Sequence, residues 1–167
     1  MPKHSWRFSA IGTDWEIDSS KPLSTGLQGL ITKHIEAFEL QLSRFIETSL
    51  VSNLHSTLGP ITFDSSLVPL FELYESLETL TDGQMTPTVG SVLAAAGYDA
   101  RYSLTPQSYI PPAIRYTDVV RRSGSTLSLN QPVMLDFGAA GKGLLVDQLT
   151  EILIQRDKEV QMAAHEY

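Results

Sequence analysis

The sequence contains no cysteine among its 167 residues. This absence excludes disulfide scaffolds, thiolate zinc sites, cysteine nucleophiles and cysteine-linked lipid anchors. Basic residues are also scarce, because 12 Lys and Arg stand against 19 Asp and Glu, a formal net charge of −7. Nucleic-acid binding depends on surplus basic charge, so we expect no nucleic-acid partner.

Long apolar runs are missing as well. The first residues lack the apolar core of a signal peptide, and no stretch approaches the roughly 18 apolar residues of a membrane span. We therefore expect no membrane span and a cytoplasmic location. The hydrophobic fraction of 42% can still form a core, and the length is that of one ordinary domain. We expect a single domain over residues 1–167 and leave the oligomeric state open.

Apolar residues spaced three and four apart predict three main helices. One runs from a start near Pro22 to Phe45, and a second follows the capping cluster at Asp64 and ends near Asp82-Gly83. The third follows Gly143. Residues 91–96 predict short helical turns, whereas Pro87 excludes a regular helix over 86–90.

Four segments predict β structure. Residues 6–18 alternate around a glycine bend and favour a strand or bent hairpin, and 117–122 with 125–130 predict a hairpin around a Ser-Gly turn. Residues 133–135 predict a further short strand. The proline-containing stretch 101–116 reads as an exposed connection. We therefore predict an α/β protein of the α+β kind, with helices packed on a mixed sheet.

The segment 136–143 (DFGAAGKG) is the strongest candidate for chemistry. A strand, a glycine-rich turn and a helix together offer backbone N–H groups and a dipole end to an anion. Lys142 adds a mobile charge that suits phosphate, and Asp136 ends the expected strand. The pattern is neither a Walker A loop nor a dinucleotide fingerprint. Small residues here can also serve close helix packing alone, and this alternative stays open.

Four motifs in order make the chain similar to the ApbE family, the FAD:protein FMN transferases. They are residues 11–15 (IGTDW), 39–45 (ELQLSRF) followed by Ser49 and Asn53, 81–90 (TDGQMTPTVG) followed by 97–99 (GYD), and 135–143 (LDFGAAGKG) followed by Val146-Asp147. Together they cover most of the chain up to residue 147.

The resemblance implies a Mg²⁺-dependent transfer of FMN from FAD to a Thr or Ser hydroxyl of an acceptor flavoprotein, with release of AMP. It also implies an ApbE-like, T-fold-related half-domain. The residues expected to contact FAD as substrate are Ile11, Phe45, Thr86, Pro87, Thr88, Asp136 and Lys142, and the expected metal contact is the backbone carbonyl of Ala139. No catalytic residue is assigned.

The sequence departs from the family pattern in three places. Ile11 stands where the family usually has Met, and Met85-Thr86 replaces a Phe-Asp pair, which removes a carboxylate from the cofactor site. The family's later segments, which complete the metal site, have no match, so we expect a domain truncated at its C-terminal side. We further expect exposed apolar sheet surface and marginal stability. The alternatives are a non-catalytic FAD-binding protein, an inactive remnant, or a domain whose glycine-rich turn serves packing only.

Overall fold

A computed structural model of the chain describes residues 4–99 and 103–165. The chain divides into two compact units. Unit 1 comprises Met1–Phe38 and Gly141–Tyr167, and unit 2 comprises Glu39–Ala140. Helices α1 (Thr25–Leu42) and α6 (Gly138–His165) each contribute residues to both units.

Unit 1 begins with an antiparallel hairpin of β1 (His4–Ala10) and β2 (Thr13–Ser19). Its two-residue turn is Ile11-Gly12, and both residues have positive φ, 46° and 71°. Such a turn matches the twist of the flanking strands, so the predicted bent hairpin is confirmed. A β-branched residue is strained in this left-handed region, and Ile11 therefore holds the turn at a cost in free energy.

The apolar side chains of this hairpin gather on one of its faces. Trp6 lies opposite Ile17 and Phe8 opposite Trp15, and the Phe8 and Trp15 rings stack with centroids 6.2 Å apart. All four side chains are only partly buried. The expectations of exposed apolar sheet surface and of marginal stability both stay predictions.

Helix α1 is shorter than predicted at both ends. It begins at Thr25 rather than near Pro22, because the Ser24 hydroxyl accepts the Leu27 N–H at 3.2 Å. It ends at Leu42, before Phe45. Within unit 1, α1 and α6 are joined by a contact of 2.8 Å between His34 Nε2 and Gln148 Oε1. The buried apolar residues of these two helices in unit 1 are Ile31, Ile35, Phe38, Leu145 and Leu149.

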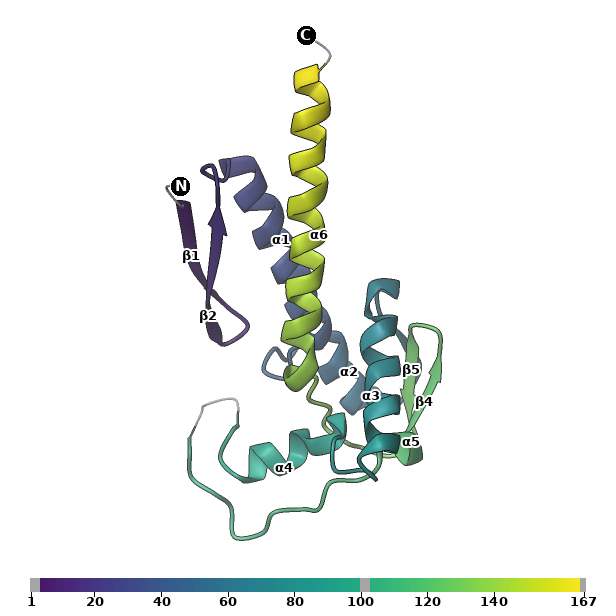
Figure 1. Cartoon of the computed structure of the whole chain (residues 1–167). Helices are drawn as coiled ribbons and strands as arrows, with labels where there is room; N and C mark the ends of the chain where they lie inside the picture. Colours follow the sequence, from purple (N-terminus) through teal and green to yellow (C-terminus); the bar gives the residue numbers. More distant parts are fainter. Residues whose placement is uncertain (1–3, 100–102, 166–167) are drawn as a thin grey trace. The chain divides into compact units, whose positions relative to one another are not determined.

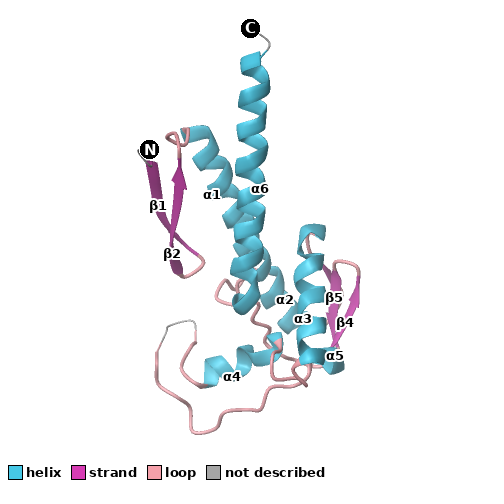
Figure 2. Cartoon of the chain, viewed as in Figure 1, coloured by secondary structure: helices cyan, strands magenta, loops and turns pink. Residues whose placement is uncertain are grey.

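Unit 2 contains a three-stranded antiparallel sheet in the order β3-β5-β4, whose β5 strand contacts α2. Figures 1 and 2 show β4 and β5 side by side. The strands are β3 (Ile61–Thr62), β4 (Val120–Ser123) and β5 (Thr126–Leu129). The α-helices are α2 (Leu50–Thr57), α3 (Val68–Leu80), α4 (Gly90–Ala95) and α5 (Tyr116–Val119), with 3-10 turns η1 (Ser65–Leu67) and η2 (Pro87–Val89).

An aromatic cluster forms the centre of unit 2. Phe71 meets Phe63 edge-on at 5.5 Å between ring centroids and meets Phe137 at 5.6 Å. Tyr74 packs edge-on against Phe137 at 5.5 Å. Because Phe137 directly precedes α6, this cluster fixes the start of α6 against α3.

The α+β class is confirmed, with helices and two small antiparallel sheets. Within residues 4–99 and 103–165 all strand pairs are antiparallel, so the parallel pairing that a mixed sheet requires is not found there. The predicted Asp64 cap is confirmed, since its carboxylate accepts the Ser66 N–H at 2.8 Å. No helix in the described part of the chain is long and apolar enough to cross a membrane.

Two local predictions were wrong, and one helix was missed. The missed helix is α2, which Ser49 caps by accepting the Ser52 N–H at 3.2 Å. The segment 117–122 begins as the helical turn α5, and the strand starts only at Val120. Residues 133–135 form no strand; Val133 and Leu135 are buried instead, so their apolar character reflects packing rather than strand pairing.

Candidate functional site

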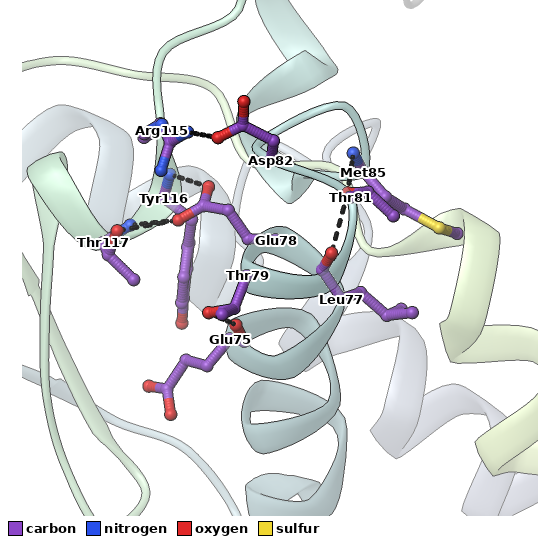
Figure 3. Close-up of polar contacts among 10 residues, drawn as sticks. All are labelled: Glu75, Leu77, Glu78, Thr79, Thr81, Asp82, Met85, Arg115, Tyr116 and Thr117. Atoms are coloured by element: carbon purple, nitrogen blue, oxygen red, sulfur yellow. Dashed lines mark hydrogen bonds and ion pairs between the residues drawn. The ribbon is translucent and has the colours of Figure 1, made fainter.

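The third motif forms a tight loop after α3. Asp82 and Gly83 both adopt positive φ, at 50° and 82°, so the backbone turns back on itself. The Gly83 N–H donates to the Glu78 carbonyl at 2.8 Å. The Thr81 hydroxyl donates to the Leu77 carbonyl at 2.7 Å and accepts the Met85 N–H at 2.9 Å, as Figure 3 shows. The loop is thus tied to the last turn of α3 at both of its ends.

The residues that follow this loop are buried. Thr86 is 7% exposed and Thr88 is 1% exposed. Their hydroxyl oxygens lie 3.0 Å apart, and the Thr88 hydroxyl also donates to the Ile114 carbonyl. Thr88 therefore holds the segment in place rather than presenting its side chain to a ligand. Gln84 and Met85, just before them, are exposed.

The side chain of Glu78 is a buried carboxylate in the last turns of α3, before the loop that leads to Thr86. Glu78, on α3, is 2% exposed and accepts the N–H of Tyr116, the N–H of Thr117 at 3.0 Å and the Thr117 hydroxyl at 2.8 Å (Figure 3). Burial alone would raise the pKa of this carboxyl, but these hydrogen bonds and one from Thr86 outweigh it and leave the pKa below its ordinary value. Glu78 is therefore ionised at neutral pH.

Arg44 links three of the sequence motifs. Its Nε donates to Asp136 Oδ2 at 2.6 Å and its Nη2 donates to the Tyr98 carbonyl at 2.8 Å. Its guanidinium carbon also lies 4.1 Å from the centroid of the Phe45 ring, a cation–π contact. The Asp136 N–H in turn donates to the Pro87 carbonyl at 2.7 Å. Phe45, Pro87 and Asp136 are thereby brought together within unit 2.

Side chains of unit 2 occupy the first N–H groups of α6. Asp136 Oδ1 accepts the Gly138 N–H at 2.7 Å, and the Tyr74 hydroxyl oxygen accepts the Ala140 N–H at 3.3 Å. Burial raises the pKa of the Tyr74 phenol, the Ala140 N–H lowers it and the Asp136 charge raises it, with a net increase. Anion binding by residues 136–143 would therefore depend on Lys142, which is exposed, more than on these N–H groups.

Two glycines of this segment, Gly141 and Gly143, are not required by packing. A Cβ on Gly141 would lie 3.7 Å from the Phe38 ring, an ordinary contact, and a Cβ on Gly143 would meet nothing within 4 Å. The close approaches occur in the third motif. A Cβ on Gly90 would lie 2.9 Å from the Met134 carbonyl carbon. Gly97 has a positive φ of 99°, and a Cβ on it would lie 2.7 Å from the Thr105 nitrogen.

Of the residues expected to contact FAD or metal, unit 2 holds Phe45, Thr86, Pro87, Thr88, Asp136 and Ala139, and unit 1 holds Ile11 and Lys142. Among the first group, Phe45 is 41% exposed, Ala139 is exposed, and the Asp136 side chain is 15% exposed. The sequence analysis did not assign roles to Arg44, Tyr74 or Glu78. Arg44 lies within the second motif, residues 39–45, which is a signal that could have identified it. No feature of the sequence distinguishes Tyr74 from a core aromatic residue or Glu78 from a surface carboxylate.

A magnesium site is not completed by these residues. Mg²⁺ requires a near-octahedral set of oxygen ligands, and the expected contact is a single backbone carbonyl, that of Ala139. Within residues 4–99 and 103–165 no group of three or more His, Asp or Glu side chains could hold a metal ion. The described residues alone therefore do not fit a complete magnesium site.

The fold resembles that of solved flavin transferases. The flavin transferase ApbE from Vibrio cholerae aligns in a mutant form with a TM-score of 0.79 and 20% identity, over 93% of this chain and 57% of that chain. The ApbE protein from Thermotoga maritima aligns with a TM-score of 0.73 and 20% identity, over 94% of this chain and 54% of that chain. The flavinyl transferase ApbE from Pseudomonas stutzeri aligns with a TM-score of 0.69 and 16% identity, over 90% of this chain and 56% of that chain.

The fold is thus that of an α+β protein, similar to part of the solved flavin transferases. The family model described as "ApbE family" matches residues 11–163, and the chain belongs to the ApbE family. It spans little more than half the length of the solved structures that it matches. No curated protein matches the chain.

Proposed function

We propose that this chain carries the FAD-binding part of a flavin transferase. The whole reaction would move FMN from FAD to a Thr or Ser hydroxyl of an acceptor flavoprotein and release AMP, with Mg²⁺ required. The observation that carries this proposal is the Arg44 network, because it gathers Phe45, Pro87 and Asp136 from three separate motifs of the family.

The residues present suit a flavin nucleotide. The exposed Phe45 ring can stack on an aromatic ring system, and the ammonium group of Lys142 suits a phosphate. Phosphoryl transfer depends mainly on positioning and charge stabilisation. The part of the chain described would therefore bind and orient FAD. The Mg²⁺ requirement and the hydroxyl-bearing acceptor are part of the proposal and are supported by the resemblance to the family.

The test is a fluorescence titration of the chain with FAD, with and without Mg²⁺, for the wild type, Lys142→Ala and Lys33→Ala. Lys33 is exposed on α1 and serves as the matched control. We expect saturable binding that weakens about tenfold or more in Lys142→Ala, the loss of one charge-assisted contact, and stays unchanged in Lys33→Ala. Absence of binding in the wild type contradicts the proposal.

A non-catalytic FAD-binding protein or an inactive remnant is the second candidate. It is favoured by the described residues, among which no group of three or more His, Asp or Glu side chains could hold a metal ion. AMP release from FAD, measured by chromatography with Mg²⁺ and a hydroxyl-bearing acceptor flavoprotein, separates the two. Binding without AMP release supports the second candidate, and AMP release supports the transferase.

A further inference from the structure

Arg44 is a charged residue whose side chain is only 7% exposed. It lies in the turn between α1 and α2, outside any regular helix or strand. Its Nε donates to Asp136 Oδ2 at 2.6 Å, its Nη2 donates to the Tyr98 carbonyl at 2.8 Å, and its Cζ lies 4.1 Å from the centroid of the Phe45 ring. One side chain thus touches its neighbour in the turn and two segments that are distant in sequence.

These contacts fix how the Phe45 ring lies. The donors of a guanidinium group lie in its plane, whereas its faces can stack on an aromatic ring. Because Nε and Nη2 are both engaged, the plane of the Arg44 guanidinium is set, and the Phe45 ring that lies against its face is set with it. Phe45 is 41% exposed. The accessible part of the ring is therefore presented to a ligand in one orientation.

The Asp136 carboxylate is oriented at both of its oxygens. Oδ2 accepts from Arg44, and Oδ1 accepts the Gly138 N–H at 2.7 Å. The backbone N–H of Asp136 donates to the Pro87 carbonyl, also at 2.7 Å. Each oxygen of a carboxylate can accept more than one hydrogen bond, but an ionised carboxylate has no proton to donate. Asp136, whose side chain is 15% exposed, can therefore receive an O–H or N–H group of a nucleotide but not a phosphate.

We propose that Arg44 is a positioning residue of the flavin-nucleotide site. It holds the Phe45 ring in the orientation that stacks on a ring system of the nucleotide, and the Asp136 carboxylate in the orientation that accepts one of its O–H or N–H groups. Arg44 acts through these two residues and does not itself contact FAD. This inference rests on the proposed function, because it names how two expected contacts of that same site are kept in place.

Arg44→Lys separates positioning from the mere supply of a charge. Lysine keeps the positive charge, but its compact ammonium group has no planar fork that could join Asp136 to the Tyr98 carbonyl while a flat face supports the Phe45 ring. We expect the FAD dissociation constant to rise about threefold or more. A role in neutralising Asp136 alone predicts full recovery with lysine, so a smaller rise overturns the inference.

A double-mutant cycle of Arg44→Met with Phe45→Leu tests the step through the ring. Arg44→Met alone should raise the FAD dissociation constant about tenfold or more, the equivalent of one charged hydrogen bond. In the Phe45→Leu background the same change should have an effect that is smaller by about threefold or more, because no ring is left to be positioned. Equal effects in the two backgrounds overturn the inference.

Arg121→Met is the matched control. Arg121 is an exposed arginine of β4 in the same unit, and its Nη1 donates to the Thr117 carbonyl at 3.0 Å. Its replacement should leave the FAD affinity within about twofold of the wild type, since a surface substitution of this kind has a small effect. Each titration is made at a temperature at which circular dichroism shows the variant folded.

The outcomes distinguish this inference from the proposed function. If the wild type fails to bind FAD, the proposed function fails and takes the inference with it. If the wild type binds FAD and Arg44→Met binds it equally well, the inference alone is wrong. If Arg44→Met does not fold, Arg44→Lys, which keeps a charge beside Asp136, tests the inference by the criterion given for it above.

Discussion

Replacing Arg44 with methionine tests the network that joins the motifs. The Arg44 side chain is 7% exposed and that of its partner Asp136 is 15% exposed, with the two groups 2.6 Å apart. The change also removes the donor to the Tyr98 carbonyl, 2.8 Å from Nη2. Methionine fills similar volume without a charge, so the loss is mainly electrostatic.

The expected loss follows from the burial of both partners. Breaking a buried pair by removing one partner costs about 3–5 kcal/mol. Because Asp136 keeps some solvent and still accepts the Gly138 N–H, the lower end applies, and we expect about 3 kcal/mol. For a chain of this size that lowers the melting temperature by about 6–12 °C.

The measurement is urea or thermal unfolding followed by circular dichroism, with Arg7→Met as the control. Arg7 pairs with Glu16 at 3.1 Å, but the two side chains are 76% and 45% exposed. Exposed pairs contribute about 0–1 kcal/mol, so the control should hardly change stability. If Arg44→Met costs no more than Arg7→Met, the assignment of Arg44 as the central link is refuted.

The outcomes for four further variants can be measured by unfolding. Gly90→Ala should destabilise by about 1–3 kcal/mol because its Cβ would press on the Met134 backbone, whereas Gly29→Ala in α1, with nothing within 4 Å, should stabilise by about 0.5–1 kcal/mol. Ile11→Asn should stabilise by about 1 kcal/mol by relieving the φ of 46°, and unchanged stability would argue against strain there. Because the folded-state pKa of Glu78 is lowered, its stabilisation is present above the ordinary value of 4.5 and lost as pH falls below it. Glu78→Gln should flatten that part of the pH dependence.

The sequence predicted those elements whose side chains repeat over several turns. The three- and four-residue spacing of apolar side chains predicted helices α1, α3 and α6. The β1-β2 turn and the Asp64 cap were also predicted correctly. Helix α2 was missed because its buried residues Val51 and Leu54 span less than one turn and carry no readable period. Residues 133–135 were assigned to a strand because an apolar run has the same appearance whether it pairs or only packs.

The candidate site was predictable in its motifs but not in its connections. Asp136 could be chosen from sequence, yet its partner Arg44 lies 92 residues away. In the sequence, Glu78 does not differ from an ordinary helix carboxylate, and its donor Thr117 lies 39 residues further on. Such pairings depend on the tertiary fold, which local patterns do not specify.

The motifs are better understood together than one at a time. Arg44 of the second motif holds Asp136 of the fourth and the Tyr98 carbonyl of the third, and the Asp136 N–H reaches Pro87 of the third. Residues in one hydrogen-bond network have coupled effects on stability. A substitution in any one motif of unit 2 therefore disturbs the other two. Through the same coupling, these segments would affect the proposed flavin binding even where, as at Thr88, the side chain is buried.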